Sequence, residues 1–480
     1  MSHATWTHPF ANDPRAYASA KMRALLSDDA KFETWRKLWL NGARCQRQLG
    51  LAITEGQIAE METHLKDPIK YDHVAELEVK KRHDVMAHLA YFGELCPAAA
   101  PIMHQGFTSC TITDNADLLL HRETLELVEI RLARVIARLM EFARRHWDLV
   151  ILGATHYQAA EPVTLGKRAC LWIQDLLADL RNIRALSSAL PFLGAKGATG
   201  TQGPLLTLFN GDKDRVLEFD RLFAESCGFV ELSPLLAGQT YSRKIDANII
   251  SALAALGSTL ARISNDLRLM AHDYELQEPR TEDQVGSSAM AFKRNPMLAE
   301  RLRAIARWLM GMAAIGQQMY ADQWLERTLD DSATRRILIP ETYLAADACL
   351  LIAQYLFEGA SANTAVIAAN VRRQLPFLAT SEVLAAATRA GLSRQTAHEH
   401  IRVLSMEAWD GIFNRGEGNN LLERIKDNPF FAPIKDQVDS LAEPNVGLAP
   451  DQVAWFITGT VEPALAMYRD NLDERVTLNF

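Results

Sequence analysis

The stretch from Gly286 to Pro296, Gly-Ser-Ser-Ala-Met-Ala-Phe-Lys-Arg-Asn-Pro, combines small residues with two adjacent cations. Small residues let a backbone approach a ligand closely, and Lys293 and Arg294 supply positive charge. Asn295 and Pro296 are typical of a helix start, with asparagine as the N-cap and proline at the first helical position. Because helix N-termini attract anions, this basic loop (Gly286 to Pro296) could bind a carboxylate. The alternative is a flexible loop that only precedes a helix.

Two further stretches contain histidines that we considered for proton transfer or metal binding. His156 lies in Thr-His-Tyr-Gln, just ahead of a second periodic segment, and histidine is the usual proton donor or acceptor near neutral pH. A lone histidine is also a common structural residue, so both interpretations stay open. His83 and His88 are five residues apart, whereas two metal ligands on one helix face are four apart. We therefore expect no metal site here.

Hydroxyl groups and arginines gather in two more stretches. Gly106 to Cys110 is hydroxyl-rich and precedes Thr113 and Asp114, for which helix capping is a sufficient explanation. Residues 323–336 contain three arginines and Ser332. Guanidinium groups suit phosphate better than any other side chain, although a solvated charged turn is the alternative. The glycine-rich stretch 197–202 follows no expected strand, which excludes a P-loop or dinucleotide site, and we expect no cofactor.

Composition limits the function classes. The 480 residues are 48% hydrophobic and 23% charged, with a formal net charge of −8, which excludes a general nucleic-acid or membrane surface. The six cysteines form no CxxC pair, so we expect neither disulfides nor zinc. Residues 1–19 lack an apolar signal region, and no run of 18 apolar residues occurs. These features predict a soluble cytoplasmic protein.

Helical periodicity dominates the chain. Five long segments are expected at 113–147, 162–190, 242–276, 296–325 and 335–359, with shorter helices before them, clearest at 35–51 and 74–92, and after them. Long amphipathic helices need one another to bury their apolar faces. We therefore predict an all-α protein with three helical domains, at 1–111, 112–360 and 361–480, around a central bundle. Small residues such as Gly257 and Gly311 suit packing against other subunits or within a tight monomer core.

The basic loop resembles the signature Gly-Ser-Ser-x-Met-Pro-x-Lys-x-Asn-Pro of the fumarase/aspartase superfamily. Its flanks, together with Thr155 to Asp175, Gly197 to Gln202, Gly238 to Lys244 and Gln374 to Phe377, are similar to the adenylosuccinate lyase family, in the longer form of animals and some bacteria. These matches span most of the chain. The resemblance implies a bundle shared in a homotetramer, with each active site built from three subunits and acting on a small succinyl-nucleotide.

The implied reaction is β-elimination of fumarate from adenylosuccinate, and from the succinylcarboxamide ribotide of purine synthesis. The resemblance assigns Ser287 as general base, His156 as general acid and His83 as support for them. Lys293 would stabilise the aci-carboxylate together with Asn295, Thr108 and Ser109. The other residues that it places in substrate binding are Tyr17, Arg82, Asp84, Gln239, Arg301, Arg327, Ser332 and Arg336.

Four positions depart from the family pattern. Ala16 replaces a phosphate-binding arginine, with Arg15 offset by one, while Ala159, Glu161 and Ala291 replace proline, glutamine and proline. They motivate a second hypothesis, a paralogous lyase that releases fumarate from another succinyl adduct. A third hypothesis is a catalytically silent structural oligomer. Retention of Ser287, His156 and Lys293 argues against it.

Overall fold

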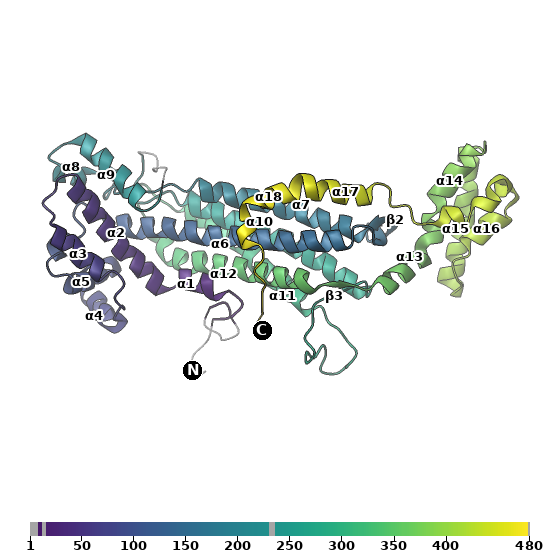
Figure 1. Cartoon of the computed structure of the whole chain (residues 1–480), viewed down its shortest axis with the longest axis horizontal. Helices are drawn as coiled ribbons and strands as arrows, with labels where there is room; N and C mark the ends of the chain where they lie inside the picture. The colour runs from purple at the N-terminus through teal and green to yellow at the C-terminus, as the bar shows by residue number, and fades with distance from the viewer. Residues whose placement is uncertain (1–7, 12–15, 230–235, 479–480) are drawn as a thin grey trace.

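In the computed structural model five long helices form one extended bundle, with smaller helical lobes at both ends (Figure 1). The structure describes residues 8–11, 16–229 and 236–478, so Arg15 lies outside the described residues. The bundle helices are α6 (Ser109–Arg145), α7 (Leu165–Ser188), α10 (Lys244–His272), α11 (Met297–Ala321) and α12 (Asp330–Gly359). The all-α prediction is confirmed, and the homotetramer stays a proposal.

The start of α6 differs from the sequence prediction. The helix begins at Ser109, where the Thr108 N–H donates to the Thr111 hydroxyl at 3.3 Å. Thr113 and Asp114, expected as caps, therefore lie inside the helix. The Asp114 carboxylate is instead buried and accepts a hydrogen bond from Arg243 at 2.8 Å. The expected capping role was wrong because the preceding turn supplies its own cap.

A β-hairpin precedes α7, where the sequence predicted a loop and an earlier helix start. Strands β1 (Val150–Thr155) and β2 (Gln158–Thr164) pair antiparallel, and Thr155 faces Gln158 across a two-residue turn. His156 and Tyr157 form that turn with φ of 51° and 58°. Two consecutive left-handed residues match the right-handed twist of a hairpin. Pairing of the strand residues delays the helix to Leu165.

The start of α11 is capped by a distant carboxylate. Glu278 accepts the N–H groups of Leu298 and Ala299 at 2.9 and 2.6 Å, and the helix begins at Met297 rather than at Pro296. The Asn295 side chain donates instead to the Gly286 carbonyl at 2.9 Å. The predicted N-cap role of Asn295 was therefore wrong. The protein's own carboxylate fills the anion position that we expected a ligand to take at this helix end.

Before α6 the chain forms shorter helices, as expected: α1 (Ala20–Leu25), α2 (Asp28–Gln48), α3 (Glu55–Thr63), α4 (Tyr71–Lys81) and α5 (Asp84–Leu95). Two short helices that we did not predict, α8 (Gly203–Leu208) and α9 (Lys213–Ser226), lie at the same end of the molecule (Figure 1) and complete the N-terminal lobe. The segment predicted as one amphipathic piece at 74–92 is broken, because Arg82 adopts φ 51° and ends α4. Because of this break, Arg82 and His83 lie between α4 and α5, and Asp84 is the first residue of α5.

The C-terminal part contains α13 (Thr364–Leu378), α14 (Thr380–Arg389), α15 (Arg394–Arg415), α16 (Leu421–Asp427), α17 (Ala449–Phe456) and α18 (Glu462–Leu465). Residues between Val383 and Val438 form a core of their own. Val453, Ile457 and Leu465 instead join the core of the bundle, along which α17 and α18 lie (Figure 1). The short strands β3 (Leu276–Gln277) and β4 (Ser361–Ala362) pair antiparallel. The division at residues 111 and 360 stays a prediction.

Two bundle helices, α10 and α12, are long and apolar enough to cross a membrane when judged by length and composition alone. In their most apolar windows 61% and 78% of the residues are buried inside the protein. Packing in the core accounts for this apolar character, so the two helices are weak evidence for a membrane.

Candidate active site

A cavity of about 870 Å³ lies where the N-terminal lobe meets the bundle. Residues from α4, α5, α6 and α12 and from the segment before α10 line it. The structure brings eight sequence-predicted residues together around this first cavity: Arg82, His83, Asp84, Ser109, Gln239, Arg327, Ser332 and Arg336. The stretches that carry them are far apart in the sequence. Thr108 is the N-cap of the same helix that begins with Ser109.

A chain of polar contacts crosses one wall of the first cavity. Arg336 donates to Asp84 at 2.8 Å, and the Nδ1 atom of His83 lies 3.4 Å from the other Asp84 oxygen. On its far side the Nε2 atom of His83 lies 3.0 Å from the Ser109 hydroxyl. Burial opposes the charge on Asp84, but the Val85 N–H, Arg336 and His83 outweigh it and lower the pKa of this carboxyl. Asp84 is therefore an anion between two cationic or polar groups.

Arg327 is held by a carboxylate that belongs to a larger buried network. Asp331 accepts from Arg327 at 2.7 Å and from Arg243 at 2.5 Å. Arg243 also pairs with Asp114, and the surrounding carboxylates raise its pKa against the opposing effect of burial. The network fixes Arg327 at the cavity wall with its guanidinium half-buried. Sequence reasoning did not single out Arg243 or Asp331, although Arg243 lies in the matched stretch Gly238 to Lys244 and Asp331 in the charged stretch 323–336.

Gln239 is positioned from two sides. Its N–H donates to the Glu326 carbonyl at 3.0 Å, and the Cys110 thiol lies 3.6 Å from its side-chain oxygen. A Cβ at the preceding Gly238 would come within 2.5 Å of the same Glu326 carbonyl, so only glycine allows this close approach. The thiol contact favours an amide orientation that leaves the Gln239 NH₂ group for a ligand.

A second cavity of about 1050 Å³ lies beside the basic loop. Lys293 and Asn295 line it together with Gly286, Arg268 and Tyr157. A Cβ at Gly286 would come within 2.2 Å of the Lys293 carbonyl, which explains the glycine. Lys293 is exposed and Asn295 is half-buried. The two side chains are available to an anion that enters this cavity.

Ser287 caps a turn within the basic loop. Its hydroxyl accepts the N–H groups of Ala289 and Met290 at 3.4 and 3.1 Å. Two backbone donors aimed at one oxygen favour a negative charge there, as a serine that loses a proton requires. The half-buried Ser287 is not among the residues that line the second cavity, although the adjacent Gly286 is.

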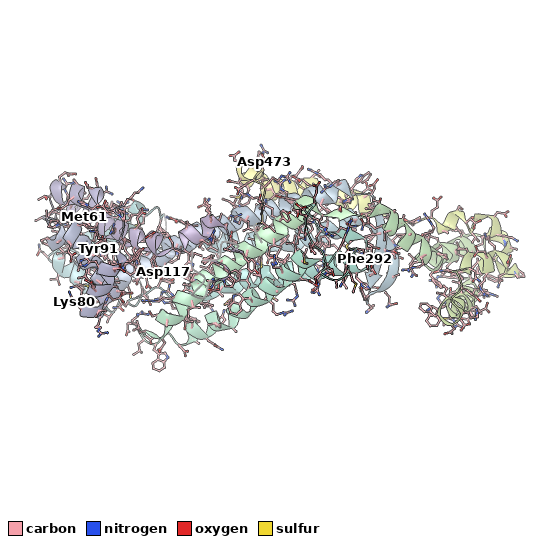
Figure 2. All side chains as sticks on the ribbon, turned by 90° about the horizontal axis from the view of Figure 1, so that it is seen from below. Met61, Lys80, Tyr91, Asp117, Phe292 and Asp473 are labelled. Atoms are coloured by element: carbon pink, nitrogen blue, oxygen red, sulfur yellow. The ribbon has the colours of Figure 1, made fainter. Side chains whose placement is uncertain are left out.

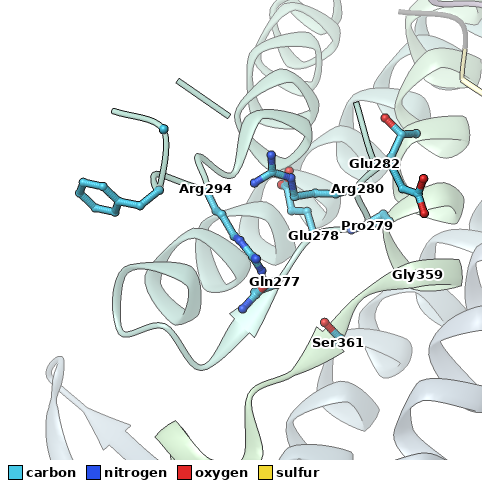
Figure 3. Close-up of a pocket in the computed structure, with 11 residues that line it drawn as sticks. Gln277, Glu278, Pro279, Arg280, Glu282, Arg294, Gly359 and Ser361 are labelled. Atoms are coloured by element: carbon cyan, nitrogen blue, oxygen red, sulfur yellow. Dashed lines mark hydrogen bonds between the residues drawn. The ribbon is translucent and has the colours of Figure 1, made fainter. Parts of the chain in front are cut away.

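The base of the basic loop is fastened by polar contacts around a smaller cavity of about 510 Å³ (Figure 3). Arg294 donates to the Gln277 side chain, and Arg280 donates to the Gln284 carbonyl at 2.5 Å. Glu278, which caps α11, lies between them and was not predicted. Burial raises its pKa despite its two backbone donors. The polar run that precedes the basic loop was the only feature of the sequence that could have indicated Glu278.

Besides Thr108 and Ser287, three more predicted residues lie outside both groups of cavity-lining residues: His156, Arg301 and Tyr17. His156 is exposed at the hairpin turn, and its neighbour Tyr157 lines the second cavity. Arg301, in the first turns of α11, lies over the Tyr17 ring with 5.5 Å between guanidinium and ring centre. This is cation–π distance and places Tyr17 beside the helix that follows the basic loop.

One chain does not bring all the predicted residues together. Asp117, on the wall of the first cavity, and Phe292, in the basic loop, lie well apart along the molecule (Figure 2). The first cavity contains His83 and the predicted arginines Arg82, Arg327 and Arg336, whereas the basic loop contains Ser287 and Lys293. A reaction that needs both sets of groups requires more than one chain.

Comparisons with known proteins identify the family of the chain. The family model described as "Lyase" matches residues 46–311, and the one described as "Adenylosuccinate lyase C-terminus" matches residues 376–454. The chain is 44% identical to adenylosuccinate lyase of Schizosaccharomyces pombe, over 95% of this chain and 96% of that protein. It is also 44% identical to the enzyme of Saccharomyces cerevisiae, over 96% and 97%. The Schistosoma mansoni enzyme is 41% identical over 95% and 96%.

Solved structures share the fold. A fumarate lyase from a Mesorhizobium species superimposes with a TM-score of 0.79 at 21% identity, covering 95% of this chain and 99% of that one. The 3-carboxy-cis,cis-muconate lactonizing enzyme of Pseudomonas putida gives 0.80 at 22% identity, covering 95% and 98%. Identity this low bears on the fold alone, whereas the long matches to curated relatives bear on the family. The chain therefore belongs to the adenylosuccinate lyase family of the fumarase/aspartase superfamily.

Proposed function

We propose that this chain cleaves adenylosuccinate to AMP and fumarate, and the succinylcarboxamide ribotide of purine synthesis to its carboxamide and fumarate. The observation that carries this proposal is 44% identity, over nearly the full length, with two yeast adenylosuccinate lyases. The first cavity supports it, because Arg327, Ser332 and Arg336 line one wall and suit a nucleotide phosphate. The activity is that of a fumarate-releasing C–N lyase.

The reaction has two proton transfers. Ser287 takes the proton from the carbon beside a succinyl carboxylate, and the electron pair forms the C=C bond of fumarate while the C–N bond breaks. His156 gives a proton to the departing nitrogen. The carbanion formed on the way is stabilised as an aci-carboxylate by Lys293 and Asn295, with hydroxyl donors from Thr108 and Ser109. The Ala289 and Met290 N–H groups at the Ser287 oxygen support its role as base.

Each complete site is assembled from three subunits of a homotetramer. Support comes from the separation of the first cavity from the basic loop within one chain (Figure 2). Exposed apolar side chains on α11, including Trp308, Ile315 and Tyr320, offer a surface for packing against other copies. The composition and the scattered, buried cysteines agree with a cytoplasmic enzyme.

The first test is fumarate release from adenylosuccinate by the purified protein, followed by ultraviolet absorbance. Turnover by the wild type and its loss in Ser287→Ala, with the folded and assembled state unchanged, is the expected result. A folded tetramer that does not act on adenylosuccinate would overturn the proposal. Ala16, which replaces a family arginine, would then favour the alternative, a paralogous lyase acting on a different succinyl adduct.

A further inference from the structure

Asp84 lies between Arg336 and His83 on the wall of the first cavity. One carboxylate oxygen pairs with Arg336 at 2.8 Å, and the other lies 3.4 Å from His83 Nδ1 and accepts the Val85 N–H at 2.7 Å. Because Asp84 is the first residue of α5, the helix dipole also favours its negative charge. One carboxylate therefore faces both an arginine on the phosphate side and a histidine on the catalytic side.

The two contacts differ in strength. An Arg336–Asp84 distance of 2.8 Å is that of a full charge-assisted hydrogen bond, whereas 3.4 Å to His83 is long for one. The Arg336 side chain is 60% exposed, so an entering anion can reach it. A phosphate at that guanidinium would compete with Asp84 for the same donors. Without a phosphate, the pairing of one Asp84 oxygen with Arg336 holds the other oxygen 3.4 Å from His83 Nδ1.

We propose that Asp84 is a positioning residue that couples phosphate binding at Arg336 to the orientation of His83. When the substrate phosphate takes the guanidinium, the carboxylate is released to accept a full hydrogen bond from His83 Nδ1–H. That bond fixes the imidazole tautomer, with the Nε2 lone pair directed toward Ser109 and the substrate. The inference rests on the proposed function, since it takes the phosphate to be that of the nucleotide substrate.

The consequence is that phosphate acts on turnover as well as on binding. A substrate without the phosphate would bind more weakly and would also meet an unaligned His83. Binding energy from a remote, unreactive group would thus be used to orient groups at the reacting centre. This separates the proposal from a purely electrostatic role of Arg336, which would change KM alone.

The experiment compares adenylosuccinate with its dephosphorylated nucleoside, with and without added inorganic phosphate. For the wild type we expect the nucleoside to show a kcat lower by about 10- to 100-fold, and inorganic phosphate to restore part of it. Asp84→Asn should lower kcat on adenylosuccinate by a similar factor, and inorganic phosphate should no longer change its kcat on the nucleoside. Phosphate that changes only KM, or that raises kcat equally in both proteins, would contradict the proposal.

A matched control and a second measurement complete the test. Glu78→Gln removes a carboxylate from the wall of the same cavity and should keep the effect of phosphate on kcat. In a double-mutant cycle with His83→Gln, Asp84→Asn should add little further loss of kcat, because it acts through that histidine. If the losses of kcat in the two single variants multiply in the double variant, the two residues act independently and the proposal is overturned. If the nucleoside is not cleaved at all, the result of this cycle alone decides the proposal. Failure of wild-type turnover on adenylosuccinate is a separate result that rejects the proposed function instead.

Discussion

The two arginines proposed to bind phosphate in the first cavity are each held by a carboxylate of the protein itself. Arg336 is held by Asp84, and Arg327 by Asp331. The residue types indicated phosphate binding, since arginine clusters suit phosphate. Arg336 and Asp84 are 252 positions apart, and periodicity within one segment contains no information on their pairing. Arg327 and Asp331 are only four residues apart, so that pairing was within reach of the sequence. Residue identity was therefore predictable, and the long-range pairing was not.

His104 is expected to make the protein less stable in acid. Its Nδ1 atom accepts the indole N–H of Trp39 at 3.0 Å, and burial, with a smaller effect of His83, lowers its pKa to about 4. The unfolded chain titrates near 6.5, so it binds the proton more readily than the folded protein does. The stabilisation is therefore fully present above about pH 6.5 and is lost as the pH falls toward 4. We expect Tm to fall across this range.

The variant His104→Asn tests whether His104 causes this loss of stability in acid. Asparagine keeps an acceptor at the δ position and tolerates the φ of 64° found at this residue, but it does not titrate. The fall of Tm between pH 6.5 and 4 should become shallower than in the wild type. It should not vanish, because burial lowers the pKa of His88 to about 4 as well. An unchanged slope would show that His104 plays no part.

At the level of elements, periodicity identified the five bundle helices but misplaced their starts. The start of α11 depends on Glu278, and the start of α7 on strand pairing with residues 150–155. A helix end is satisfied by whichever acceptor reaches its free N–H groups, and that partner need not be adjacent in sequence. The hairpin was missed because its turn, His156-Tyr157, lacks the glycine or asparagine that usually marks left-handed positions.

The hairpin turn allows the chemistry of His156 to be separated from its backbone role. Asparagine tolerates the left-handed conformation at φ 51° but cannot transfer a proton near neutral pH. His156→Asn should therefore lower kcat by about 10²- to 10⁴-fold with little change in Tm. A β-branched control, His156→Val, should lower both. Near-normal turnover in the asparagine variant would reject His156 as the general acid.

At the scale of the whole molecule, the bundle architecture followed from sequence pattern, but the division of the active site did not. Ser287 and His83 are both recognisable in the sequence, yet only the structure separates the first cavity from the basic loop along the bundle (Figure 2). The number of copies that complete a site is a property of surfaces, and a single sequence does not specify how surfaces meet. Assembly therefore needs its own experiment.

Mixing two inactive variants tests that assembly. His83→Ala and Ser287→Ala are each expected to abolish most turnover when expressed alone. If a site takes these residues from different subunits, random co-assembly leaves about a quarter of the sites free of both changes. Co-expressed protein should then recover activity near that fraction of the wild type. Recovery no greater than either variant alone would place both residues in the same chain.

The buried network around Arg243 also has a consequence for how the chain is made. It joins Asp114 of α6, Asp246 of α10 and Arg335 of α12, so its charges come from three distant parts of the sequence. A buried charge without its partner costs several kcal/mol, so burying Asp246 becomes favourable only once Arg335 of α12 is present. This part of the bundle can therefore close only after the growing chain has been extended through α12, which ends at Gly359.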